Sequence, residues 1–363
     1  MASIKSFFIT IFLASRLASS SPVMAVPHRR NANVVTATNE TNTVEPSVPV
    51  FPRKASTDAP YSVNEEALRG AIHIPSTFEY GSGSKTPVVL VPGTAVSSDI
   101  TWANGFAKLL GQTDYADPVW LNIPGDSLGD IQITAEYVAY AINYIAGVSK
   151  DKKLGVVSWS QGGINTQWAF KYWPSTVEVV TDLIALAADF NGTVLAPLIC
   201  SPLTGFLCTP AIIQQENGSN LITALRSNGG DSAFVPTTTF YSDSDEIVQP
   251  QNGTSASAYL LDGRSVGVTN NQVQTVCGDK NMVVLHEGAL YNALAWGLIQ
   301  DALTHDGPGQ VSRLDVASLC NQESAPGIDG LAVEAAVAVS ASTNILESED
   351  KTLEEPAVAS YAL

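Results

Sequence analysis

The sequence predicts one α/β domain in which helices cover a mostly parallel central sheet. Short β-rich apolar runs alternate with segments of helical spacing over residues 61–340, and one run passes through a tight turn into a helix that opens with two glycines. Strands that alternate with helices form parallel sheets, because each helix returns the chain to the edge where the next strand begins. A single domain of this length can bury a full hydrophobic core.

The individual elements follow in order along the chain. The apolar run 87–92 is the first predicted core strand, and the spacing of 131–146 predicts the first long helix. The run 154–157 is a second strand that leads into the helical segment 162–173. The remaining predicted elements are strands at 183–188, 235–241 and 282–285 and a helix at 290–303.

Composition restricts the function classes. Apolar residues make up 45% of the chain and charged residues 15%, and the formal net charge is −17. This composition excludes a wholly disordered chain. The negative charge argues against nucleic acid and anionic membrane surfaces as partners. Because no apolar run of 18 residues occurs outside the N-terminus, we predict no integral membrane segment.

The two ends of the chain differ from the predicted domain. Residues 1–25 hold a basic residue, an apolar stretch and a small-residue run, which indicates a secretory signal peptide and an extracellular location. Residues 26–60 are interpreted as a pro-segment or flexible leader, with Arg29-Arg30 or Arg53-Lys54 as the hypothetical processing site. Residues 341–363 contain an acidic run and are predicted to fray.

Cysteines and glycosylation sequons also fit a secreted protein. The four cysteines, at 200, 208, 277 and 320, form no CxxC pair for zinc, so an oxidising compartment predicts two disulfides. The glycosylation candidates are Asn39, Asn191, Asn217 and Asn252.

The strongest chemical signal surrounds Ser160. Within 156–163 a strand ends at a turn that holds Ser160, and the following helix begins with Gly162 and Gly163. This is the pattern of a nucleophile elbow, which places a serine at the carboxyl edge of a sheet. Ser158 stands where the usual pattern has glycine, although serine is also small. The structural alternative is a serine that caps the helix.

A serine nucleophile requires a base, and His286 is the best placed of four histidines. It follows the predicted strand 282–285, which puts its imidazole at the carboxyl edge of the sheet. His28 lies in the leader, His73 precedes the first core strand, and His305 follows the last predicted helix. The structural alternative for His286 is a hydrogen-bonded core histidine.

The acid of such a triad comes between the serine and the histidine in this fold class. Asp245 follows the strand 235–241 and satisfies that order, with Asp243 and Glu246 as local competitors. The residues alone do not rank these three carboxylates.

Two glycine-containing segments are compared with known ligand-binding patterns. Residues 81–86 approximate a phosphate-binding loop, but Ser84 replaces a glycine of that pattern and the segment precedes a strand. No G-x-G-x-x-G follows the first strand, so we predict no nucleotide cofactor, and we predict no metal. Residues 91–95 do follow the first strand, where an α/β-hydrolase places half of its oxyanion hole, although a simple Pro-Gly turn is the alternative.

The chain resembles a known family at several strings in the same order. It is similar to Candida antarctica lipase B and its fungal relatives over roughly 65–325. The strings are LVPGT at 90–94, SWSQGG at 158–163, QQ at 214–215, LITALRSNGG at 221–230, VPTT at 235–238 and SDEIVQPQ at 244–251.

This resemblance implies an α/β-hydrolase fold and a role for each matching residue. It implies Ser160 as nucleophile, Asp245 as acid and His286 as base, which resolves the choice among the carboxylates. Thr94 and Gln161 would form the oxyanion hole through their amides and the threonine hydroxyl. The implied substrate-binding residues are Trp159 below the small alcohol-side pocket, Asp189 and Gln215 on the acyl side, and Ile247 at the entrance. A core aromatic and a structural carboxylate are the alternatives for Trp159 and Asp189.

The resemblance also bears on the disulfides and on a lid. Cys277 and Cys320 match a family disulfide, which leaves Cys200 to pair with Cys208. These last two lie in 194–209, which is longer than its family counterpart and is a lid candidate. Residues 331–341 resemble the helix that walls the family's substrate channel.

The expected function is that of a secreted, monomeric serine hydrolase acting on carboxylic esters, of lipid or triacylglycerol type, at times at a lipid–water interface. The alternatives are a cutinase-like or polyester hydrolase, an acyltransferase, and, in a different class, a non-catalytic binding protein with a hydrolase fold.

Overall fold

The central sheet sets the architecture. The computed structural model describes residues 42–201 and 203–363, so the predicted signal peptide 1–25, the Arg29-Arg30 pair and Asn39 lie outside the described residues. Seven strands are arranged in the order β1-β3-β2-β4-β5-β6-β7. All neighbouring pairs are parallel except β1 with β3. The strands are β1 Ile72–His73, β2 Thr86–Val91, β3 Ala116–Leu121, β4 Leu154–Trp159, β5 Val180–Leu186, β6 Thr237–Tyr241 and β7 Val268–Gln272.

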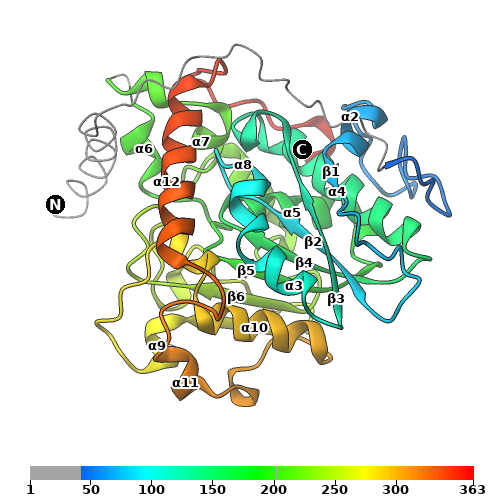
Figure 1. Cartoon of the computed structure of the whole chain (residues 1–363). Helices are drawn as coiled ribbons and strands as arrows, with labels where there is room; N and C mark the ends of the chain where they lie inside the picture. Colours follow the sequence, from blue (N-terminus) through cyan, green and yellow to red (C-terminus); the bar gives the residue numbers. More distant parts are fainter. Residues whose placement is uncertain (1–41, 202) are drawn as a thin grey trace, which may run out of the picture.

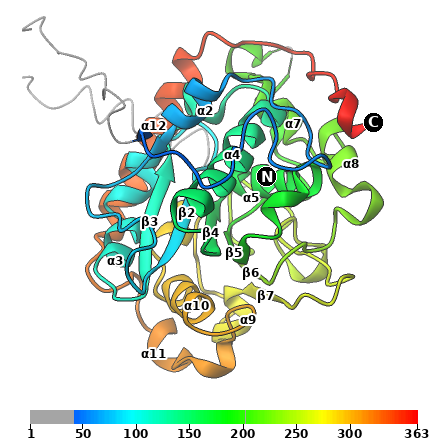
Figure 2. The same cartoon turned by 90° about the vertical axis from the view of Figure 1, so that its right-hand side faces the viewer.

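Alternating side chains along the strands divide the core into two layers. In β2, Val89 and Val91 join one hydrophobic cluster, whereas Val88 and Leu90 join the other. Successive side chains of a strand point to opposite faces, so each face must be covered by helices. Figure 2 shows α4 and α5 on one side of the strands and α10 on the other.

The helices divide between these two layers. The first cluster is formed with α2 Glu65–Gly70, α4 Ile131–Val148, α5 Gln161–Tyr172, α7 Pro210–Gln214 and α8 Asn220–Arg226. The second is formed with α3 Phe106–Gly111, α9 Val273–Cys277, α10 Ala293–Thr304, α11 Val316–Cys320 and α12 Gly330–Glu347. The short α6 spans Ala196–Ile199 and lies beside α12 in Figure 1. The predicted α/β architecture is confirmed.

One predicted element is wrong: residues 282–285 form no strand. The sheet ends instead at β7, whose residues Thr269 and Asn270 are too polar to give an apolar pattern. The 282–285 segment has no regular secondary structure and is held by side-chain hydrogen bonds. Val284 donates its N–H to Ser244 Oγ at 2.9 Å, and Gln274 Nε2 donates to the carbonyl of Met282 at 2.9 Å. The sequence analysis also missed β1 and β3.

The described part of the predicted leader, residues 42–60, is packed onto the domain. Val50 is buried, and Tyr144 donates its hydroxyl to the carbonyl of Val44 at 2.7 Å. Lys54, half of the second dibasic pair, donates to Asn143 Oδ1 at 3.2 Å. The expectation of a flexible leader up to residue 60 is therefore wrong for its second half.

The acidic tail does not fray as expected. The helix α12 continues through the predicted boundary at 341. Beyond it, the Glu355 carboxylate accepts the backbone N–H groups of Asn220 at 3.0 Å and Leu221 at 2.8 Å, at the start of α8. An acid at a helix N-terminus meets amides without intrahelical partners, which explains why this negatively charged segment stays docked. Tyr361 packs its ring against Trp173.

Two disulfides are present, with the pairing that the family resemblance implies. Cys277–Cys320 joins α9 to α11, and Cys200–Cys208 closes a short loop within 194–209. Among residues 42–201 and 203–363, no helix combines the length and apolar character needed to cross a membrane.

Candidate active site

Ser160 lies on a strained turn between β4 and α5. Its φ of 55° and ψ of −131° are rare for a residue with a side chain, and such strain concentrates at functional sites. The turn requires glycines on its helical side. A Cβ on Gly162 would lie 2.7 Å from the carbonyl oxygen of Val91, and one on Gly163 would lie 2.6 Å from Ala188 Cβ.

The structure brings the three predicted triad residues into one hydrogen-bonded chain. His286 Nε2 lies 2.9 Å from Ser160 Oγ, and His286 Nδ1 lies 2.8 Å from Asp245 Oδ2. All three residues are buried, between 3% and 4% exposed. Because nucleophile, base and acid are within hydrogen-bond distance, the arrangement can transfer a proton from the serine to the histidine.

Asp245 differs from its two competitors in what its carboxylate contacts. Its Oδ1 accepts the backbone N–H groups of Ile247 at 2.9 Å and Val248 at 2.7 Å, which leaves Oδ2 for the imidazole. Glu246 instead accepts the backbone N–H of His286 at 3.1 Å. Asp243 Oδ2 lies 3.5 Å from Gln272 Nε2.

The other histidines lie in different surroundings. His73 stacks on Trp120 with ring centroids 4.2 Å apart, and His305 pairs with Asp301 at 3.2 Å. His28 lies outside the described residues.

Acidic neighbours dominate the electrostatics around His286. Burial alone lowers the pKa of His286, but the carboxylate of Asp245, helped by Glu287 and Glu246, outweighs burial and raises that pKa to about 9. Burial and the proximity of Glu287 raise the pKa of Glu246 to about 8, and burial raises the pKa of Glu287. The sequence analysis missed Glu287, although it directly follows the histidine.

The predicted oxyanion residues meet in a small polar network. Thr94 Oγ1 lies 2.6 Å from Gln161 Oε1 and 3.1 Å from Gln215 Oε1. Gln161 is the first residue of α5, where backbone N–H groups have no intrahelical partner. The loop that carries Thr94 is pressed against the nucleophile, because a Cβ on Gly93 would lie 2.8 Å from Ser160 Cβ. Gly93 is thus a second residue that the sequence analysis did not single out, although its Pro-Gly turn was noted.

The predicted substrate-binding residues lie around this network. Trp159 tilts against the His286 ring at 5.0 Å and donates its Nε1–H to the His286 carbonyl at 3.3 Å, so it also contacts the candidate base. Asp189 is fully buried, and burial raises its pKa to about 7. No other described residue hydrogen-bonds to either carboxyl oxygen of Asp189. Ile247 is half-buried beside Asp245.

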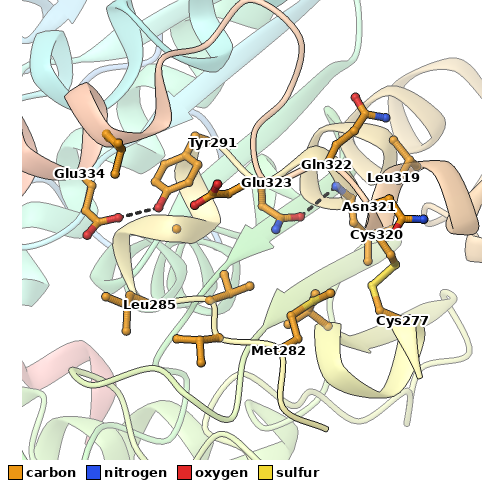
Figure 3. A pocket seen from close by; sticks show the side chains of 17 residues that line it. Cys277, Met282, Leu285, Tyr291, Leu319, Cys320, Asn321, Gln322, Glu323 and Glu334 are labelled. Carbon is orange, nitrogen blue, oxygen red and sulfur yellow. Dashed lines mark hydrogen bonds between the residues drawn. A yellow bond between two sulfur atoms is a disulfide. The ribbon is translucent and has the colours of Figure 1, made fainter. Parts of the chain in front are cut away.

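A cavity of about 610 Å³ borders the segment that carries His286. Figure 3 shows the Cys277–Cys320 disulfide at one end and the hydrogen bond between Tyr291 and Glu334 at the other. None of the three triad residues lines this cavity. We therefore do not place the ester substrate there.

The lid candidate 194–209 is a compact, partly apolar surface segment. Leu203 is 91% exposed, and Val194 and Leu198 are also exposed. The segment begins next to the site, because Thr193 donates its backbone N–H to the carbonyl of Gln215 at 2.7 Å.

The glycosylation candidates differ in exposure. Asn252 and Asn217 are exposed, and the Asn217 side chain donates to the carbonyl of the half-buried Asn191 at 2.8 Å.

No protein-family model matches the chain. Lipase B of Pseudozyma antarctica is 39% identical over 225 residues, which cover 61% of this chain and 63% of that protein. This match therefore spans less than two thirds of the relative's length. Aspergillus fumigatus lipase B, known from a crystal structure, is 52% identical in sequence, and the match covers 88% of this chain and 77% of that chain. The two structures superimpose with a TM-score of 0.84.

Proposed function

Because the chain belongs to the lipase B family of α/β-hydrolases, we propose that it is a secreted serine hydrolase that cleaves carboxylic esters of lipid or triacylglycerol type. The observation that carries this proposal is the buried chain of two hydrogen bonds, at 2.9 Å and 2.8 Å, from Ser160 through His286 to Asp245. A domain that used Ser160 only to cap a helix would not need these two hydrogen bonds. The Ser160 side chain also makes no capping hydrogen bond to α5.

The reaction has two halves. In the first, His286 Nε2 takes the proton from Ser160 Oγ while the oxygen attacks the ester carbonyl carbon. The tetrahedral oxyanion is stabilised by the backbone N–H groups of Thr94 and Gln161 and by the Thr94 hydroxyl. His286 then protonates the leaving alcohol, which leaves an acyl group on Ser160. In the second half, His286 takes a proton from water or another alcohol, whose oxygen attacks the acyl carbon. As the bond to Ser160 Oγ breaks, His286 returns the proton to that oxygen, and the acid or new ester leaves.

Asp245 and Trp159 hold the base in place during both halves. The Asp245 carboxylate fixes the tautomer with the proton on Nδ1 and stabilises the imidazolium that forms. Trp159 donates its Nε1–H to the backbone carbonyl of His286, and its ring lies against the imidazole, which restricts movement of the imidazole away from Ser160.

Secretion, monomeric state and glycosylation are part of the same proposal. Two disulfides require an oxidising compartment to form, which supports export through the predicted signal peptide. The exposed Asn252 is the best-placed glycosylation candidate among the described residues.

Covalent labelling tests the function directly. The secreted protein should hydrolyse short and long p-nitrophenyl esters and triacylglycerol emulsions, and a phosphonate ester should label Ser160 in a reaction that requires His286. Ser160→Ala should fold normally and lose nearly all turnover, since this side chain serves chemistry more than packing. Label on a different serine, or a wild type without esterase activity, refutes the assignment and favours a non-catalytic binding protein.

A further inference from the structure

The helix α12 is connected to the oxyanion loop, residues 93–95, by one side chain in its last turn. Asn344 Nδ2 donates to the carbonyl of Ala95 at 2.9 Å and to Asp126 Oδ2 at 2.8 Å. It also lies 3.3 Å from Ser340 Oγ in its own helix. No motif of the sequence analysis contains Asn344, and the mechanism above does not use it.

The acceptor of this bond is a buried and strained residue. Ala95 is fully buried and has φ of +64°, a left-handed conformation that non-glycine residues adopt at a cost. Its N–H donates to the carbonyl of Asp126 at 2.7 Å. Both peptide groups of Ala95 are thus tied, one to the 124–127 turn and the other to α12. Without these bonds, the left-handed residue would relax and the backbone on its N-terminal side would turn with it.

The backbone on that side carries the oxyanion donors. Thr94 directly precedes Ala95, and Gly93 approaches Ser160 so closely that even a methyl group would not fit between them. The loop is therefore bounded by the nucleophile on one side and by Asn344 on the other. Displacement of a reacting or stabilising group by 1 Å can reduce a rate about a hundredfold.

We propose that Asn344 is a positioning residue for ester hydrolysis, which holds the Thr94 donors in register with Ser160 by fixing the Ala95 carbonyl. This inference rests on the proposed function, because it concerns the same oxyanion hole. This role would make α12 part of the catalytic geometry. The same helix contacts the 205–207 turn of the lid candidate. A movement of this helix would thereby reach the oxyanion hole through one hydrogen bond.

Two substitutions of Asn344 test this role. Asn344→Ala removes the donor. Asn344→Asp keeps the shape of the side chain, removes the amide hydrogens and places a second carboxyl group beside Asp126, to which Asn344 Nδ2 donates at 2.8 Å. In both variants we expect kcat for a soluble ester to fall about tenfold with KM within about twofold, because the oxyanion donors that Asn344 positions act on the transition state more than on the bound ester. The rate of inactivation by a phosphonate, which builds the same tetrahedral geometry on Ser160, should fall by about the same factor.

Ser342→Ala is the matched control, since Ser342 is on the same helix and its hydroxyl donates only to the carbonyl of Ala338, at 2.7 Å, within that helix. We expect it to keep the wild-type kcat. Melting curves by circular dichroism establish that each variant is folded, and the isosteric Asn344→Asp decides the outcome if Asn344→Ala melts near room temperature.

Three outcomes overturn the inference: kcat unchanged in folded Asn344→Asp, a rise in KM with kcat unchanged, or an equal loss of kcat in Ser342→Ala. The proposed function fails differently, because then the wild type itself lacks esterase activity and phosphonate labelling. If the wild type is active and labelled but kcat of Asn344→Asp is unchanged, only the role of Asn344 is overturned.

Discussion

Replacing Gly93 by alanine tests how tightly the oxyanion loop is packed against the nucleophile. The added Cβ would lie 2.7 Å from Trp159 Cε3 and 2.8 Å from Ser160 Cβ. Ordinary carbon contacts begin near 3.4 Å, so loop and nucleophile must separate by about 0.6 Å. All of these neighbours are buried in the site, and none is the free end of a flexible side chain.

The magnitude follows from this displacement. Overpacking of a core by one methyl group costs about 1–3 kcal/mol of unfolding free energy. A shift of just over half an ångström in the oxyanion donors should raise the activation free energy by about 2 kcal/mol, which corresponds to a loss of roughly thirtyfold in kcat. We therefore expect Gly93→Ala to be folded, less stable and severely slowed.

The assay compares kcat and KM on p-nitrophenyl butyrate with the unfolding free energy in urea. Gly111→Ala provides the matched control, because its Cβ would meet only Pro118 Cγ at 3.9 Å, in the last turn of α3. That variant should keep full activity and wild-type or slightly higher stability. If Gly93→Ala keeps more than a third of the wild-type kcat, the loop does not define the oxyanion geometry and the reasoning is refuted.

Three further predictions concern the acid, the base and the lid. Asp245→Asn should lower kcat by about four orders of magnitude while Asp243→Asn stays within a few-fold, because the carboxylate at 245 fixes the imidazole tautomer; equal losses in a stopped-flow acylation assay would contradict this. Asp245 holds the pKa of His286 above its usual value, at about 9, so kcat/KM should still rise between pH 7 and pH 9 and fall on the acid side as the base is protonated. A profile that is flat over this range excludes His286 as the base. The double variant Cys200→Ser, Cys208→Ser removes a disulfide of sequence separation 8, which contributes about 2–3 kcal/mol by loop entropy. It should change the activity on emulsified esters relative to soluble ones, and an unchanged ratio shows that segment 194–209 does not gate the site.

The sequence predicted the parts of the fold whose residues have a regular apolar pattern. The core strands β2, β4 and β5 lie between two helical layers, so their runs are largely apolar and easily recognised, whereas β6 is recognised by its β-branched threonines and its aromatic residues. The edge strand β7 escaped detection because its half-exposed side chains are largely polar. Residues 282–285 gave a false strand because they are apolar, while their hydrogen bonds go to side chains such as Ser244.

The residues of the candidate site also differ in how far the sequence could predict them. The elbow around Ser160 is local in sequence, so its geometry could be predicted from a few residues. The choice of Asp245 over Glu246 depended on the family resemblance, and only the distances to His286 give it a physical basis. Asn344 could not be found from the sequence, because its contacts with Ala95 and Asp126 join residues 249 and 218 positions apart.

Segments 42–60 and 355–362 bear on how the protein is made. Helix α4 is buried on nearly every side, and both segments cover it: Tyr144 bonds to Val44, and Gln132 bonds to the backbone of Ala357 and Ala359. Residues 355–362 leave the ribosome only after the rest of the domain has been synthesised. Until then, one end of an apolar helix has no cover, and apolar surface that is exposed during synthesis promotes aggregation. We therefore expect α4 to need protection from aggregation during synthesis until the tail has docked.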